Sequence, residues 1–193
     1  MYIPSAFQFS EQEAIAFVRE NSFGMLVSEG LHVSHIPMLL KETDEGLKLC
    51  GHIANNNPQI ADINSGAKAK AIFAGPHAYI SPLWYSEPLR NVPTWNFQAV
   101  EISGTLTRVP EEGANASLRA QVEQYETKWS IDDLSEKYVA GNLRAISFFE
   151  LCIDDIIGKN KMSQNKSQTE RGLIADALTA QDQNDIAHLI RNQ

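Results

Sequence analysis

The stretch FAGPHAYISPLWYSEPLRNVPTWNF, residues 73–97, is the part around which the chain is organised. It carries Trp84 and Trp95, two of the three tryptophans, together with four of the eight prolines. Because proline fixes φ and has no N–H, we expect neither a helix nor a strand ladder to run through this stretch. Two interpretations follow. The stretch is either a rigid loop whose aromatic rings line a binding pocket or a stiff corner packed on the core.

Strand patterns lie on both sides of this stretch. Strands are predicted at 23–28, 32–40, 47–53, 68–74 with a continuation at 78–81 after a Gly75–Pro76 turn, 95–109, and 145–157, where Gly158 ends the last one. About six strands with few helices between them predict a mainly β protein whose antiparallel sheet closes on itself.

Sequence patterns typical of helices occur near both ends of the chain and between the predicted strands. Ser10 and Glu13 have the spacing of a capping box, and Asn57 before Pro58 is typical of a helix start. Apolar residues from Leu118 to Trp129 recur on one helical face. We expect a single domain over residues 1–193, with a helical C-terminal segment at about 167–193.

Composition narrows the class of protein. The formal net charge is -8, which disfavours a broad nucleic-acid surface because such binding depends on neutralising phosphates. Cys50 and Cys152 are far apart and form no CxxC motif. With no signal peptide and no apolar run of membrane-spanning length, these features predict a cytoplasmic protein with reduced thiols that does not enter a membrane.

The usual catalytic and metal-binding motifs are absent, and the spacing of His35, His52 and His77 matches no metal site. Lys159, Lys161 and Lys166 stand close together without an acidic residue among them. Such a cluster on an acidic protein suits a phosphate group, although a solvated surface loop is the alternative.

Neighbouring residues extend the interpretation to a flat ring. Ser163, Gln164 and Asn165 offer polar groups that can bind the edge of a polar ring. Tyr79, Trp84 and Trp95 offer aromatic surfaces for its face. A flat heteroaromatic ring with a phosphate tail would use both kinds of contact.

Six blocks of the sequence together resemble the PaiB family of FMN-binding negative transcriptional regulators. They are MYIPSAF at the start, SHIP at 34–37, GHIA with NPQ at 51–59, AIFAGPHAYISPLWY at 71–85, VPTWNF at 92–97 and GKNKMSQN at 158–165. The resemblance implies a split β-barrel of the flavin-reductase and pyridoxamine-phosphate-oxidase type, forming a homodimer with FMN at the subunit interface.

The resemblance also implies a set of FMN-binding residues. One subunit would contribute Ser34, His35, Ile36, Pro37, His52, Ile53, Ala54 and Asn57. The partner subunit would contribute Lys161, Ser163 and Gln164, and Trp95 and Asn96 would lie beside the flavin ring.

Two functions remain open at this point. The resemblance implies a transcriptional regulator, while an FMN-dependent NAD(P)H flavin reductase or small oxidoreductase is the alternative. No residue pair stands out as a catalytic acid and base, so the sequence leaves open whether the protein is an enzyme. Direct DNA binding is not expected, because the helix from Glu111 mixes Glu123 and Glu126 with Arg119 and Lys128.

Overall fold

The computed structural model describes residues 1–193, and its strands form one seven-stranded sheet with the strand order β2-β1-β5-β6-β7-β4-β3. The strands are β1 (Phe23–Ser28), β2 (Val33–Pro37), β3 (Leu39–Thr43), β4 (Gly46–Ala54), β5 (Lys68–Ile80), β6 (Thr94–Arg108) and β7 (Ile146–Lys161). The helices are α1 (Glu11–Glu20), α2 (Ile60–Ser65), α3 (Glu111–Glu123), α4 (Glu136–Leu143), α5 (Gln168–Thr179) and α6 (Asn184–Arg191). The predicted fold class, a mainly β split barrel with C-terminal helices, is confirmed.

The chain divides into two compact units, which are described separately. The first, here called the helical unit, consists of residues 1–14, 74–100 and 157–193. The second, the hairpin unit, consists of residues 15–73 and 101–156.

In the hairpin unit, antiparallel pairs hold the short strands in register. Leu26 of β1 faces Ser34 of β2, and Ile53 of β4 faces Ser147 of β7. The core of this unit is made of fully buried apolar side chains, among them Leu26, Leu49, Phe73, Ile102, Phe149 and Leu151. Their burial supplies the main stabilising free energy of the unit.

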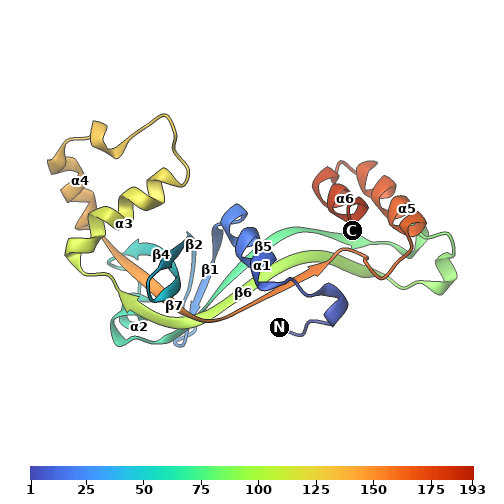
Figure 1. Ribbon diagram of the computed structural model, residues 1–193, viewed down its shortest axis with the longest axis horizontal. Coiled ribbons are helices and arrows are strands. Elements are labelled where there is room, and N and C mark those ends of the chain that lie inside the picture. Colours follow the sequence, from blue (N-terminus) through green and yellow to red (C-terminus); the bar gives the residue numbers. More distant parts are fainter. The chain divides into compact units, whose positions relative to one another are not determined.

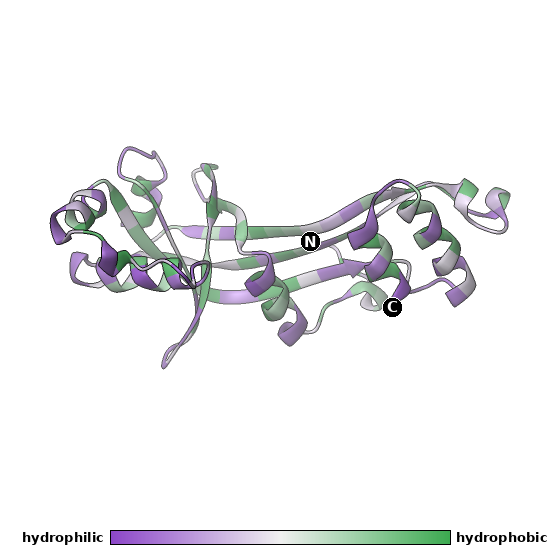
Figure 2. Cartoon of the chain, turned by 90° about the horizontal axis from the view of Figure 1, so that it is seen from above, coloured by the Kyte–Doolittle hydropathy of each residue, from purple (hydrophilic) through white to green (hydrophobic).

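In the helical unit, α5 and α6 pack against one another and against buried residues of β5 and of the segments that follow β5 and β7 (Figure 1). Figure 2 shows hydrophobic and hydrophilic residues mixed along both helices, as expected where only one face of a helix is buried. The buried set is Ala78, Ile80, Tyr85, Met162, Ile174, Ala175, Leu178, Ile186, Ala187 and Ile190. The predicted C-terminal helices therefore complete an apolar core.

The predicted strand at 32–40 is two strands. Its second half forms β3, which pairs with β4, while the first half forms β2 and pairs with β1. The break follows Pro37, and the backbone N–H of Met38 donates to the carbonyl oxygen of Ser22 at 2.8 Å. Because Met38 is also buried, this residue holds the chain in place between β2 and β3.

The predicted turn at Gly75–Pro76 is wrong, because β5 runs unbroken from Lys68 to Ile80. The partner strand β1 pairs only with residues 69–72 of β5. A proline beyond that point interrupts no hydrogen bond to β1, so the strand tolerates Pro76.

The predicted end of the last strand at Gly158 is also wrong, since β7 extends to Lys161. A Cβ atom at Gly158 would lie 2.7 Å from Cδ2 of Phe9. Glycine therefore serves close packing against Phe9 here and does not end the strand.

The helix predictions are mostly confirmed. In the capping box before α1, the Ser10 N–H donates to Glu13 Oε2 at 2.7 Å and the Glu13 N–H donates to Ser10 Oγ at 3.3 Å. The helix predicted to reach Trp129 is shorter, because α3 ends at Glu123. Asn57 precedes α2 without capping it, since Gln59 occupies the N-cap position. No helix combines the length and the apolar character that crossing a membrane requires.

Candidate functional site

In the hairpin unit, the expected FMN-binding residues lie on β2, on the end of β4 and in the turn after it. Ser34 is buried, His35 and Pro37 are exposed, and Ile36 is half-buried. The Asn57 Nδ2 group donates to Ser34 Oγ at 2.9 Å, so the structure joins these two residues from different motifs.

Gln59 holds this region together from inside. Its side chain is fully buried, and its Nε2 group lies within hydrogen-bonding distance of Leu26 O at 3.1 Å, Ser28 Oγ at 3.0 Å and His32 O at 3.2 Å. Its backbone N–H donates to Asn57 Oδ1 at 2.9 Å. Gln59 thus fixes the β1–β2 hairpin to the turn that carries Asn57. Gln59 stands in the NPQ block, but the sequence alone predicts no role for it.

A carboxylate supports the same hairpin from α2. Ser28 Oγ donates to Asp62 Oδ2 at 2.5 Å, and His32 Nδ1 lies 2.9 Å from the same oxygen. These contacts, with the Ser28 hydrogen bond first, hold the pKa of Asp62 below its ordinary value. The ionised form of Asp62 therefore stabilises the loop before β2.

The three residues at the end of β4 differ in exposure. Ile53 is buried and belongs to the core, whereas Ala54 is exposed. The half-buried His52 has its Nδ1 atom 2.6 Å from Gln121 Oε1, and its ring centroid lies 5.2 Å from that of Phe148. His52 is therefore held by neutral neighbours, and the structure contains no group of three or more His, Cys, Asp or Glu residues that could hold a metal.

In the helical unit, Asn96 and Ser163 form a buried polar pair. Asn96 is fully buried and its Nδ2 group donates to Ser163 Oγ at 2.8 Å, while its Oδ1 atom has no hydrogen-bond partner. Ser163 adopts a left-handed backbone with a φ of 62°. Burial, the largest effect, raises the pKa of the Tyr85 hydroxyl above its ordinary value. The pair fixes the turn that follows β7.

Lys161, at the end of β7, is held by neutral oxygens. Its Nζ atom donates to Thr94 Oγ1 and, at 2.8 Å, to the carbonyl oxygen of Trp95. Burial, and after it the charge of Lys159, lowers the pKa of the Lys161 ammonium. A bound anion would offset both effects.

The other two lysines of this cluster also lack a carboxylate partner. Lys159 donates to the carbonyl oxygen of Tyr2 at 3.2 Å, and Lys166 donates to Asn91 Oδ1 at 2.8 Å. The Lys166 ammonium also lies 4.9 Å from the Tyr85 ring centroid. None of the three lysines forms a salt bridge, so the cluster keeps its positive charge available to a ligand.

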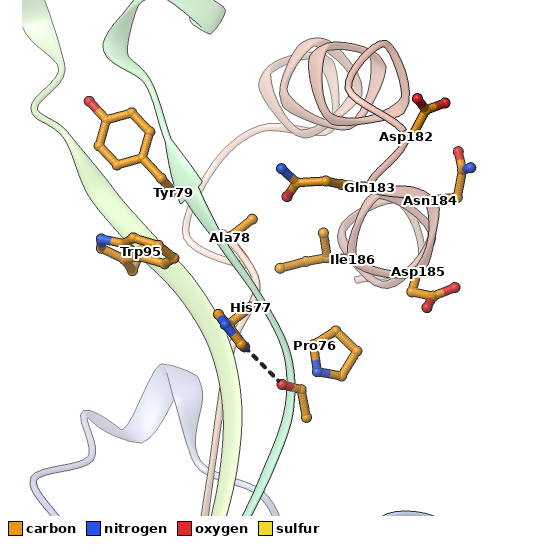
Figure 3. Close-up of a pocket in the computed structure, with 11 residues that line it drawn as sticks. Pro76, His77, Ala78, Tyr79, Trp95, Asp182, Gln183, Asn184, Asp185 and Ile186 are labelled. Atoms are coloured by element: carbon orange, nitrogen blue, oxygen red, sulfur yellow. Dashed lines mark hydrogen bonds between the residues drawn. The ribbon is translucent and has the colours of Figure 1, made fainter.

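Trp95 borders a groove of about 660 Å³ between β5, β6 and the turn that leads into α6 (Figure 3). Its side chain is 53% exposed, and its indole ring lies 6.1 Å from His77 and 6.2 Å from Tyr79, centroid to centroid. Figure 3 shows Gln183 and Ile186 directed towards the strands, whereas Asp182 and Asp185 point away from them. The groove thus has an aromatic wall.

Gln164 uses both ends of its amide within its own turn. Its Oε1 atom accepts from the Met162 N–H at 2.7 Å, and its Nε2 group donates to the Asn160 carbonyl oxygen at 2.5 Å. The contacts of Gln164 in this structure therefore fix the backbone after β7.

The residues present fit an FMN group in chemical character. An exposed indole suits the face of a flavin ring, lysines without carboxylate partners suit a phosphate, and the amides and hydroxyls suit a polar ring edge. Of the expected residues, Ser34 and Asn57 are in contact in the hairpin unit. In the helical unit, Asn96 contacts Ser163, and Lys161 contacts Trp95, the residue next to Asn96.

Solved structures share the fold. The flavocytochrome Anf3 from Azotobacter vinelandii matches with a TM-score of 0.62 and 14% identity, over 79% of this chain and 68% of that one. The FAD and heme binding protein from Mycobacterium smegmatis matches with a TM-score of 0.60 and 13% identity, over 84% of this chain and 78% of that one.

Comparison with known sequences identifies the family, which a shared fold alone does not. The protease synthase and sporulation protein PAI 2 of Bacillus subtilis is 36% identical over 180 residues, which cover 88% of this chain and 85% of that protein. Residues 1–155 match the family described as "Putative FMN-binding domain". The chain therefore belongs to this family of FMN-binding domains and is of the PaiB type, as its six sequence blocks indicate.

Proposed function

We propose that the chain works as a single FMN-binding domain in a homodimer and regulates gene expression in the cytoplasm. The observation that carries the proposal is the lysine cluster without carboxylate partners beside the exposed Trp95. Lys161 would bind the FMN phosphate, and Trp95 with Asn96 would lie beside the ring. When bound, FMN supplies redox chemistry, while the protein orients it.

The second copy would supply the other residues of the site. One subunit offers Ser34, His35, Ile36, Pro37, His52, Ile53, Ala54 and Asn57, and its partner offers Lys161, Ser163 and Gln164. Exposed apolar side chains support a dimer: Leu83 is 79% exposed, Leu89 102% and Val92 75%. Three large apolar side chains in one short segment favour burial against a partner.

The regulatory role is supported by the name of the Bacillus subtilis relative, a protease synthase and sporulation protein. The name of this relative favours regulation over a reductase activity, which stays the second candidate function. The net charge of -8 argues against direct, extensive contact with DNA. Regulation would then act through a small molecule or a partner protein.

A visible absorbance spectrum across a gel-filtration peak, with FMN added, tests the proposal. We expect flavin absorbance to coelute with a particle of dimer size. A variant with Leu89→Asp should shift to monomer and lose FMN, because a carboxylate cannot be buried unpaired at an interface. Coelution of FMN with a monomer would contradict the shared site, and rapid NAD(P)H oxidation would favour the reductase.

A further inference from the structure

A separate pocket of about 370 Å³ lies in the hairpin unit, where α3 and α4 cover the end of β6 and the start of β7. Figure 1 shows α3 and α4 together at one end of this unit. Its polar lining includes Asn55, Arg108, Arg144 and Ser147. None of the lining residues is among those assigned to FMN.

The two arginines carry charge that no carboxylate neutralises. The Arg108 guanidinium donates to Asn64 Oδ1 and to Ser147 Oγ, each at 3.2 Å, and both acceptors are neutral. The Arg144 side chain forms neither a hydrogen bond nor a salt bridge. Only its backbone is used: the N–H donates to the Ala140 carbonyl oxygen at 3.3 Å, and the carbonyl oxygen accepts from Asn55 Nδ2 at 2.8 Å. Glu111 also lines the pocket but forms no ion pair with either arginine.

A chain of hydrogen bonds holds Arg108 in position. Ser147 Oγ accepts from Arg108 and donates to Asn55 Oδ1 at 2.7 Å, and Ser147 itself is buried. Because Arg108 is already fixed, little side-chain freedom is lost when a ligand binds. Arg108 is an exposed residue, and the two neutral acceptors orient its guanidinium in the lining of the pocket.

The remaining lining is apolar and includes Val109, Leu143, Ile146 and Phe148. Two guanidinium groups bind a carboxylate well, and an apolar wall favours a hydrocarbon body next to it. We propose that this pocket binds a small organic acid, a carboxylate with a short apolar body, as a second ligand of the protein.

Calorimetric titration of the full chain without FMN tests the proposal, with hexanoate as the probe and hexanamide as its neutral counterpart. We expect saturable hexanoate binding that is at least about tenfold tighter than hexanamide binding, since a charged hydrogen bond is lost with the amide. Arg144→Gln should weaken hexanoate binding about tenfold, and Ala114→Leu should weaken it by filling the pocket.

The matched control is Lys137→Gln, which removes one positive charge from α4 outside the pocket. Arg144 has no side-chain partner, so Arg144→Gln should leave the thermal melting unchanged and separates binding from folding. An equal loss with Lys137→Gln, or no saturable hexanoate binding, would overturn the proposal.

Two further probes distinguish other occupants. Inorganic phosphate that binds as tightly as hexanoate would overturn the organic-acid assignment and leave a site for anions of any kind. FMN that competes with hexanoate one for one would overturn the second site and assign the arginines to the flavin phosphate. Hexanoate binding that persists in the FMN-loaded protein supports the proposal, and hexanoate binding stands even if FMN binding fails.

Discussion

The ammonium group of Lys161 donates a hydrogen bond to the carbonyl oxygen of Trp95 at 2.8 Å, which ties the end of β7 to the start of β6. The contact places a cation without a carboxylate partner next to a half-exposed indole. Both features belong to the proposed flavin site, and each can be removed separately.

Replacing Lys161 by glutamine should weaken FMN binding about tenfold, because the proposed charged hydrogen bond to the FMN phosphate is lost. The binding should also depend on pH. The lowered pKa of Lys161 means that its ammonium loses its proton earlier than an ordinary lysine as the pH rises, so FMN affinity falls there. Fluorescence titration at a series of pH values measures both effects. Lys128→Gln, an exposed charge change, is the control, and an equal loss in both variants would contradict the role of Lys161.

The two tryptophans of the 73–97 stretch should respond differently to truncation. Trp95→Ala should weaken FMN binding roughly tenfold and leave stability nearly unchanged, because its ring is exposed. Trp84 packs on the buried cluster beneath α5 and α6, so Trp84→Ala should lower the free energy of unfolding by roughly 1–3 kcal/mol. FMN titration and urea unfolding of both variants provide the comparison. Equal losses of FMN affinity would return the stretch to the interpretation of a stiff corner.

The lowered pKa of Asp62 predicts that the folded protein loses stability in acid. Its pKa is lower in the folded chain, so its stabilising contribution is complete above its unfolded pKa of about 3.9 and disappears as the pH falls through the folded pKa. Asp62→Asn should lose about 1 kcal/mol at neutral pH and show a shallower decline in acid. Urea unfolding across this pH range measures the difference. Parallel curves for both proteins would show that Asp62 does not carry the effect.

Two glycines should give opposite results when they are changed to alanine. A Cβ at Gly104 of β6 would lie 2.2 Å from the backbone carbonyl oxygen of Cys152 on β7, so Gly104→Ala should cost several kcal/mol, roughly 3 or more. A Cβ at Gly141 of α4 meets nothing within 4 Å, so Gly141→Ala should gain roughly 0.5–1 kcal/mol. Thermal and urea unfolding measure the stability change of each variant. A mild loss of stability for Gly104→Ala would show that β6 and β7 can separate locally.

Local patterns in the sequence predicted most of the secondary structure. The alternation of residues 95–109 predicted β6, and the capping box of Ser10 and Glu13 predicted the start of α1. These predictions succeed because period-2 alternation and helix capping act over a few residues. The wrong predictions of a turn at Pro76 and of a strand end at Gly158 have a common cause, because in both places the backbone depends on residues distant in sequence. At Pro76 it is the short β1, which does not pair with this part of β5, and at Gly158 it is the ring of Phe9.

The sequence also identified polar residues for a candidate site without assigning their partners. It gave no role to Gln59, whose amide joins three positions of the β1–β2 hairpin. It gave no signal for the pocket at Arg108 and Arg144, which are distant in sequence. Hydrogen bonds between residues so far apart depend on the register of the sheet, which alternation alone does not set.

By itself, the sequence determined that the chain is mainly β, of the PaiB type, and carries three lysines without an acidic residue among them at residues 159–166. Only the tertiary structure decided which of the expected site residues hydrogen-bond to one another: Asn96 with Ser163, Asn57 with Ser34, and Lys161 with Trp95. The physical reason is that propensity and alternation are local properties, whereas a binding site is made by side chains that sheet pairing brings together from separate strands.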